Sequence, residues 1–113
     1  MTFEYQGELT PEVVARYFRY LVNRFFKILP IRENGEGSLV PYLTSLQREL
    51  SGFRNLIDYI NGDAQYTALM AKLQWMIDNP DYKFMDFRSE VFGAISICNT
   101  LKVRYGAKGE VQP

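Results

Sequence analysis

The sequence contains no histidine and only one cysteine, Cys98, and these shortages exclude much of common enzyme chemistry. Histidine is the usual general base at neutral pH and the usual partner of serine or cysteine nucleophiles. One thiol without histidine cannot form a thiolate or mixed zinc site. The sequence also contains no glycine-rich motif for a nucleotide and no nucleophile-elbow motif. We therefore predict that the protein is not an enzyme, with no catalytic residue, no metal and no cofactor.

Paired carboxylates are the one enzymatic alternative that remains, because two such groups can act as acid and base or hold two metal ions. Four of the five candidates lie within a few residues of a predicted helix end, where capping and solvation explain an acidic side chain. No Glu-x-x-His motif is present to suggest a di-iron bundle. We therefore expect these residues to serve the structure. The candidates are Asp58, Asp63, Asp78, Asp81 and Asp86.

The chain carries no excess of charge of either sign, since 13 basic residues balance 13 acidic ones. A nucleic-acid-binding domain commonly has a basic excess, so an anion would have to bind at a local cluster. No stretch approaches the roughly 18–20 uncharged apolar residues of a membrane span, and residues 1–7 do not resemble a signal peptide. A single cysteine fits a reducing compartment. The sequence therefore predicts a cytoplasmic protein that does not contact a membrane.

Apolar residues make up 47% of the chain, and in four segments they recur every three or four positions. This spacing is typical of helices that bury one face. Cys98 belongs to the last of these stripes, so we expect a buried core residue there and not a reactive thiol. The stripes are Val14, Phe18, Leu21, Phe25 and Ile28; Leu39, Leu43, Leu46, Leu50, Phe53, Ile57 and Ile60; Tyr66, Leu69, Leu73 and Met76; and Phe84, Phe87, Val91, Ala94, Cys98, Leu101 and Tyr105.

Helix-capping and helix-breaking residues predict the boundaries of these segments. Pro11 suits a first helical position, and Pro30 is expected to stop the first helix before a glycine-rich loop of residues 31–37. Asp63 and Asp81 are expected to cap the third and fourth helices. The apolar phase is unbroken along the second segment, which favours one long helix there. The predicted helices cover residues 11–29, 39–61, 64–78 and 82–105.

The segments predict an all-α fold, a single domain built as an antiparallel, up-down four-helix bundle. The connections after the second and third helices are short, and short connections make neighbouring helices antiparallel. Near-heptad spacing implies crossing angles of about 20°. Residues 1–9 are expected to form an N-terminal arm, residues 10–106 the bundle and residues 107–113 a frayed tail, because Gly106 is a natural helix terminator.

The first helix is apolar almost all the way round, which is more than a helix in a four-helix monomer needs to bury. The surplus predicts a second layer of burial, most simply in a homo-oligomer or against another protein. The alternative is that the arm of residues 1–9, with Phe3 and Tyr5, folds back over this helix. The candidate oligomer surface comprises Tyr17, Val22, Phe26, Leu29 and, on the third helix, Trp75.

A narrow polar stripe on the first helix is rich in arginine, with tyrosine interleaved. This mixture can hold phosphates and stack on bases, so nucleic-acid or nucleotide-phosphate binding is the alternative function. The stripe can equally form ion pairs with Glu4, Glu8 or a partner chain, or remain solvated. Because the chain has no net basic charge, we favour these simpler roles. The candidate partner or anion surface comprises Arg16, Arg19, Tyr20, Arg24 and Lys27.

Two stretches of the chain resemble short, uncharacterised helical proteins of Gram-positive bacteria and their prophages. These stretches are FKILPIRE at residues 26–33 and YLxSLxxELxGF at residues 42–53, under a quarter of the chain. The resemblance implies an all-helical protein and favours an accessory protein of a mobile element. It carries over no functional residue.

Together these observations favour a non-catalytic interaction or adaptor protein that self-associates or docks onto another protein through its first helix. Buried apolar area would supply the affinity, and the arginines would supply the orientation. Nucleic-acid binding is the second hypothesis, and an enzyme with a carboxylate site is the third.

Overall fold

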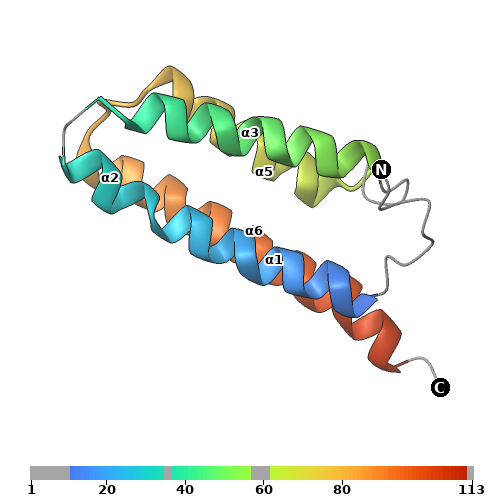
Figure 1. Ribbon diagram of the computed structural model, residues 1–113. Coiled ribbons are helices and arrows are strands. Elements are labelled where there is room, and N and C mark those ends of the chain that lie inside the picture. Colours follow the sequence, from blue (N-terminus) through green and yellow to red (C-terminus); the bar gives the residue numbers. More distant parts are fainter. Residues whose placement is uncertain (1–10, 35–36, 57–61, 112–113) are drawn as a thin grey trace.

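A computed structural model of the chain describes residues 11–34, 37–56 and 62–111 (Figure 1). In this part of the chain every regular element is a helix. The helices α1 and α2 together correspond to the first predicted helix, and α3, α5 and α6 correspond to the other three. The predicted all-α four-helix bundle is therefore confirmed. The helices are α1 (Pro11–Phe26), α2 (Ile28–Asn34), α3 (Leu39–Leu56), α5 (Ala64–Asp78) and α6 (Phe84–Val111).

The long helices form two layers, with α1 beside α6 in one layer and α3 beside α5 in the other (Figure 1). The closest packing joins α1 to α6, followed by α5 to α6 and α3 to α5. Successive long helices run in opposite directions, and α2 closes one end of the bundle against α3 and α6 (Figure 1). Among the described residues, none of the helices combines the length and the hydropathy that a membrane crossing requires.

The core consists of the apolar stripes that the sequence predicts. Every described stripe residue before α6 is buried, and so are the α6 residues from Phe87 to Leu101. Among the α6 stripe residues whose side chains the structure describes, Phe84 is the exception, because it is the first residue of the helix and its ring remains 41% exposed. The side chain of Tyr105 lies outside this description. Two residues of the second stripe, Ile57 and Ile60, lie outside the described residues. Three- and four-residue spacing therefore identified nearly all of the described core.

Pro30 does not end the first helix in the way that the sequence suggests. A single turn residue, Lys27, separates α1 from α2, and Pro30 lies in the first turn of this short second helix. The missing N–H of a proline costs nothing at that position, because first-turn N–H groups have no partner within the helix. Ile31 donates its N–H to the carbonyl of Lys27 at 3.2 Å, so the predicted loop of residues 31–37 is helical as far as Asn34.

Arg32 of α2 holds the end of the bundle together. Its Nε donates to the carbonyl of Pro80 at 3.0 Å, and Nη2 donates to the carbonyl of Tyr82. The guanidinium lies 4.5 Å from the centroid of the Phe87 ring, a distance at which a cation is attracted to an aromatic face. These contacts connect α2 to the turn between α5 and α6, and α2 is thereby part of the bundle rather than a loop.

Both predicted ends of the last helix are wrong. The helix begins at Phe84, and Asp81 lies in the preceding turn, so Asp81 does not cap it. At the other end the helix continues through Gly106 to Val111, over residues expected to fray. A glycine ends a helix where it adopts a left-handed conformation, and within a helix it costs only about 1 kcal/mol. Of the glycines in the described part of the chain, only Gly37 has a positive φ.

Asp63 caps α5 as predicted and also connects α5 to α6. Its Oδ1 accepts from the backbone N–H groups of Gln65 and Tyr66, at 2.7 and 3.1 Å. Its Oδ2 lies 2.6 Å from Nη1 of Arg104 on α6. Because the Asp63 carboxylate is buried, it depends on these charge-assisted partners to replace water.

Replacing Asp63 with alanine should lower the free energy of unfolding by about 2 kcal/mol. The loss combines a helix cap with a charge-assisted hydrogen bond. Urea unfolding followed by circular dichroism measures it. The matched control is Asp81→Ala, which removes an exposed carboxylate that caps no helix and should change stability by less than about 0.5 kcal/mol. Equal effects of the two substitutions would contradict this account of Asp63.

Candidate functional site: a groove between α1 and α3

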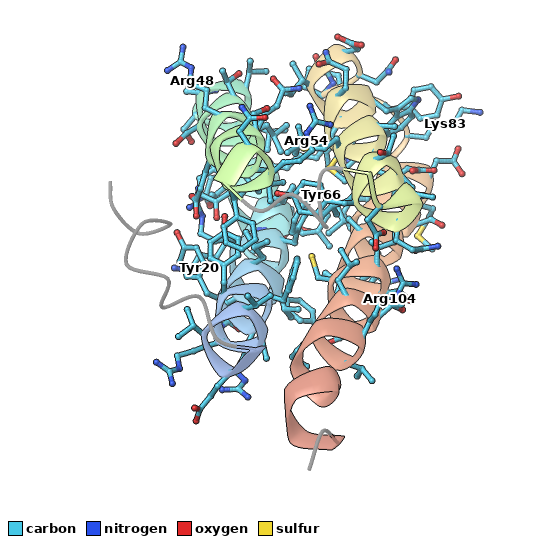
Figure 2. All side chains as sticks on the ribbon, turned by 90° about the vertical axis from the view of Figure 1, so that its right-hand side faces the viewer. Tyr20, Arg48, Arg54, Tyr66, Lys83 and Arg104 are labelled. Atoms are coloured by element: carbon cyan, nitrogen blue, oxygen red, sulfur yellow. The ribbon has the colours of Figure 1, made fainter. Side chains whose placement is uncertain are left out.

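A groove with largely apolar walls lies between α1 and α3. The backbones of these two helices approach each other at few positions, whereas the other neighbouring long helices pack closely. Long side chains therefore span the gap between them. Figure 2 shows Tyr20 on the flank of α1 that lies below α3, and Arg48 projecting from the edge of α3. The α1–α3 groove is lined by Val13, Arg16, Tyr17, Tyr20, Arg48, Glu49, Gly52 and Phe53.

Stacked aromatic rings form one wall of the α1–α3 groove. The ring centroids of Tyr17 and Phe53 are 4.0 Å apart, with an interplanar angle of 26°. Phe53 is itself anchored in the core, where it meets the edge of Phe18 at 6.0 Å. Tyr20 lies 5.7 Å from Tyr17 and extends the aromatic surface along α1. The aromatic wall is therefore continuous with the core.

Gly52 leaves the α1–α3 groove open on the side of α3. The helix continues through this residue, as the unbroken apolar phase predicts. A Cβ atom added at Gly52 would meet no atom within 4 Å. The missing side chain thus creates free space beside the aromatic wall, and a larger residue could occupy that space without displacing the backbone.

Glu49 joins α1 to α3 by accepting three hydrogen bonds from α1. Its Oε1 accepts from Nη1 of Arg24 at 2.7 Å and from the Tyr20 hydroxyl at 3.4 Å, and its Oε2 accepts from the Tyr17 hydroxyl at 3.1 Å. Arg24 and Glu49 form a charge-assisted pair, which is stronger than a pair of neutral groups. These bonds position both tyrosine rings that line the groove.

Arg24 is further enclosed by Tyr42 of α3. Its Nε donates to the Tyr42 hydroxyl at 3.0 Å, and that hydroxyl donates in turn to the backbone carbonyl of Arg24 at 2.8 Å. The guanidinium carbon lies 4.9 Å from the centroid of the Tyr42 ring. Burial opposes the charge, but the hydrogen bonds with Tyr42 and Tyr20 outweigh it and raise the pKa of Arg24. Arg24 is therefore a structural cation of the bundle.

Arg16 and Arg48 stand at the edge of the α1–α3 groove, one on each helix, and both are exposed. Within the part of the chain that the structure describes, neither guanidinium pairs with an acidic side chain. The Glu49 carboxylate, in contrast, is already engaged. The groove thus offers aromatic surface and two available positive charges.

The structure divides the predicted basic surface into three parts. Arg16 and Tyr20 line the α1–α3 groove. Arg24 is occupied by Glu49 and Tyr42 and is not available to a partner in the way that the sequence suggests. Arg19 on α1 and Lys27, between α1 and α2, are exposed and lie outside the groove. The five residues therefore do not form one continuous site.

The predicted oligomer surface is also largely used within the molecule. Tyr17 belongs to the groove wall, while Val22 and Leu29 pack partly against the core. Trp75 lies on α5, where its ring contacts Tyr82 at 5.1 Å and Phe87 at 6.1 Å between centroids. Phe26 is the most exposed of these candidates, with 47% of its surface accessible to solvent. Side-chain packing between helices thus accounts for much of the apolar surplus of α1.

Sequence reasoning missed the residues that α3 contributes to the groove. Arg48, Glu49 and Gly52 lie beside the apolar stripe of that segment and carry no motif of their own. The sequence does contain one hint: Arg24 lies next to the first apolar stripe and Glu49 lies next to the second, and the two residues have opposite charge. That signal identifies a contact only once α1 and α3 are known to be neighbours in space.

The described residues offer neither a group of metal ligands nor an ionised thiol. In the described segments, no three side chains of the kinds that bind metals come together. Cys98 is buried in the core, and desolvation raises the pKa of its thiol to about 12, so the thiolate is scarce at neutral pH. Burial, reinforced by the Glu49 carboxylate, likewise raises the pKa of Tyr17 above its usual range.

Comparisons with protein-family models, with curated proteins and with solved structures found no match to this chain. No relative therefore assigns a role to any residue of the α1–α3 groove.

The folded protein should lose stability at alkaline pH. Burial raises the pKa values of Tyr17, Tyr66 and Cys98, whereas in the unfolded chain these groups ionise from about pH 8.5 to about pH 10. Below that range these groups are protonated in both the folded and the unfolded chain, and stability is at its full value. As pH rises further, each group lowers the free energy of unfolding by up to about 1.4 kcal/mol per pH unit, because the unfolded chain loses the proton and the folded chain retains it. Urea unfolding between about pH 7 and about pH 11 measures the slope.

Tyr17→Phe isolates one of these groups, because the substitution keeps the ring against Phe53 and removes the ionisable hydroxyl. We expect a shallower fall in stability above about pH 10 in this variant. Its stability at about pH 7 separately reports the loss of the bond to Glu49. Parallel alkaline slopes in the two proteins would show that Tyr17 does not retain its proton on folding.

Proposed function

We propose that the protein is a non-catalytic interaction module that binds a short segment of another protein in the α1–α3 groove. The segment presents an apolar or aromatic side chain flanked by acidic residues. The observation that carries this proposal is the open space at Gly52, which lies beside a stacked aromatic wall and between two arginines without acidic partners in the described chain. The cytoplasm, a reducing compartment, is the proposed location.

Aromatic rings and arginine are the side chains most often found at the energetic centre of protein interfaces. The groove combines both, since Tyr17, Tyr20 and Phe53 supply apolar area and Arg16 and Arg48 supply charge. Because the hydrogen bonds to Glu49 already hold the tyrosine rings, little side-chain freedom remains to be lost on binding. Carboxylates on the partner would orient it through charge-assisted pairs with the arginines.

Nucleic acid has less support as the ligand. Phosphate binding gains affinity from each cation that is free to displace counterions, and Arg24 is already paired with Glu49. The chain also has a formal net charge of zero. A protein segment that brings only one or two carboxylates fits the available charge better than a polyphosphate backbone does.

Selection from a random peptide library with the full chain as bait tests the proposed function. We expect the bound peptides to be enriched in an aromatic residue next to aspartate or glutamate. Their affinity, measured by fluorescence anisotropy, should fall at least about tenfold for the double variant Arg16→Glu/Arg48→Glu, since two favourable pairs become repulsive. Gly52→Leu should weaken binding similarly by filling the groove.

The matched control is Arg19→Glu/Lys27→Glu, which makes the same change of charge at exposed positions outside the groove. Binding by this control should stay within about twofold of the unaltered protein, because exposed charges at a distance are screened by salt. Equal losses in both double variants would reject the groove as the binding site. A gel shift with a single-stranded oligonucleotide that only Arg16→Glu/Arg48→Glu abolishes would instead assign the site to nucleic acid.

Self-association is a second candidate, favoured by two aromatic rings that meet on the outside of the bundle. Phe26 of α1 and Phe92 of α6 are 47% and 37% exposed, and their ring centroids lie 5.9 Å apart. The Arg88 guanidinium covers one face of Phe92 at 4.6 Å. Apolar side chains that gather in this way are suited to the same patch on a second copy.

Light scattering after size exclusion tests self-association. We expect a mass above the 13.2 kDa of one chain, and a return toward that mass in Phe26→Ser/Phe92→Ser, because the apolar contact area is removed. Val40→Ser serves as the control, since Val40 is an exposed apolar residue on α3. A single species of monomer mass at high protein concentration would defeat this second candidate.

A further inference from the structure

The walls of the α1–α3 groove are helix faces, and this limits the backbone conformation of a segment that binds there. The lining residues from Arg16 to Tyr20 and from Arg48 to Gly52 lie inside α1 and α3, so their backbone N–H and C=O groups bond within those helices. Along these stretches the groove therefore offers no backbone edge on which an extended segment could pair as a strand.

The tyrosine hydroxyl groups in the groove are also engaged. The Tyr17 hydroxyl donates its proton to Glu49. The Tyr20 hydroxyl donates to Glu49 as well and accepts from Nη1 of Arg24 at 2.7 Å. An extended segment pressed against the aromatic wall would bury backbone groups without partners, which is costly. A helix pairs these groups internally and can lay a side-chain surface on the wall without that cost.

The length of the groove suits about two turns of a helix. Its lining residues on α1 run from Val13 to Tyr20, a distance of about 10 Å at 1.5 Å per residue. One helical turn beyond Tyr20, the hydrogen bond of Arg24 to Glu49 crosses the gap and bounds the groove. Two turns of a helix place side chains three or four positions apart on one face, so two apolar anchors fit along the wall. One of them can fill the space at Gly52.

The two arginines at the edge of the groove lie on opposite walls. Arg16 belongs to α1 and Arg48 to α3, and both are exposed. The ring of Tyr17 stacks on Phe53, so these two residues mark the same level of the two helices. Arg16 therefore lies roughly 7.5 Å from Arg48 along the groove, about five residues at 1.5 Å each. A helix in the groove passes between two positive charges, and each of its polar flanks can bring one carboxylate within reach of an arginine.

We infer that the segment bound by the α1–α3 groove is an amphipathic helix. Its apolar stripe lies on Tyr17 and Tyr20 and fills the space at Gly52, and an acidic residue on each flank pairs with Arg16 or Arg48. This inference rests on the proposed function, because it specifies the conformation and the residue pattern of the same ligand. Apolar residues of the partner must then recur every three or four positions, as on a helix, and not every second position, as on a strand.

Two synthetic peptides of identical composition, each about 16 residues long, test the inference with the full chain. In the helical peptide, a tryptophan and two leucines recur every three or four positions, with a glutamate on each flank of that stripe. In the alternating peptide, the same apolar residues occupy every second position. We expect fluorescence anisotropy to show that the helical peptide binds at least about ten times more tightly, and that Gly52→Leu abolishes this preference by filling the groove.

Proline substitution in the helical peptide tests the bound conformation directly. A proline in the middle should weaken binding at least about tenfold, because it removes an internal hydrogen bond and clashes with the preceding turn. A proline at the first helical position is the matched control and should leave the affinity within about twofold. Carbon chemical shifts of the isotope-labelled peptide should become helical in the complex. Tighter binding of the alternating peptide, extended shifts, or indifference to the central proline would overturn the inference.

Double-mutant cycles between protein and peptide test the two flanks. Arg16→Glu should weaken binding, and replacing one peptide glutamate with lysine should restore at least about fivefold of the loss, while the other glutamate couples in the same way to Arg48→Glu. The control Arg19→Glu alters an exposed arginine of α1 outside the groove and should couple to neither glutamate. Coupling that is absent at both arginines, or equal for Arg19, would contradict the inferred arrangement.

Selection from the random library separates the failure of this inference from the failure of the proposed function. Selected peptides that bind the groove in an extended conformation would reject the amphipathic helix and leave the proposed function standing. Selected peptides with helical shifts and apolar residues every three or four positions would support both. If neither the library nor the two synthetic peptides yields binding that depends on Gly52, the proposed function and this inference are both rejected.

Discussion

The carboxylate of Glu49 holds α1 to α3, and the α1–α3 groove depends on that connection. The three other neighbouring pairs of long helices pack closely, whereas the backbones of α1 and α3 stay apart. The gap is crossed by Arg24, Tyr17 and Tyr20, each of which donates to Glu49. Because these donors also carry the aromatic surface, the same hydrogen bonds that join α1 to α3 also shape the aromatic wall of the groove.

A hydrogen-bonded contact between helices has a different consequence from an apolar one. Leucine seams bring helices together at the distance of closest packing and leave no room for a ligand. Tyrosine and arginine reach across a wider gap with their polar ends, and their ring and stem surfaces remain partly exposed. The groove therefore arises where the bundle is joined by long amphipathic side chains, and Gly52 widens it by withholding a side chain. Its recognition properties follow from that construction: apolar surface below and positive charge at the edge.

Local signals failed where a residue acts through neighbours distant in sequence. Pro30 is a helix breaker by itself, yet it opens α2 because Arg32 anchors that helix to the turn before α6. Phe84 keeps the phase of its stripe but begins the helix and remains exposed. In the sequence Arg24 is one member of a basic stripe, whereas in the structure it is bound by Glu49 and Tyr42. Each case involves a long-range partner, which no spacing rule within a segment can supply.

The sequence by itself determined the helical class, the four buried stripes and the cap at Asp63, because helix periodicity and capping depend on residues close together in the chain. The absence of histidine is likewise read from the sequence alone, and the prediction of a non-catalytic protein depends on it. Only the tertiary structure decided which flanks face each other, and hence that Tyr17, Glu49 and Gly52 share one groove. The physical reason is that rotation of one helix about its neighbour is settled by side-chain packing among all the helices, and no single segment contains that information.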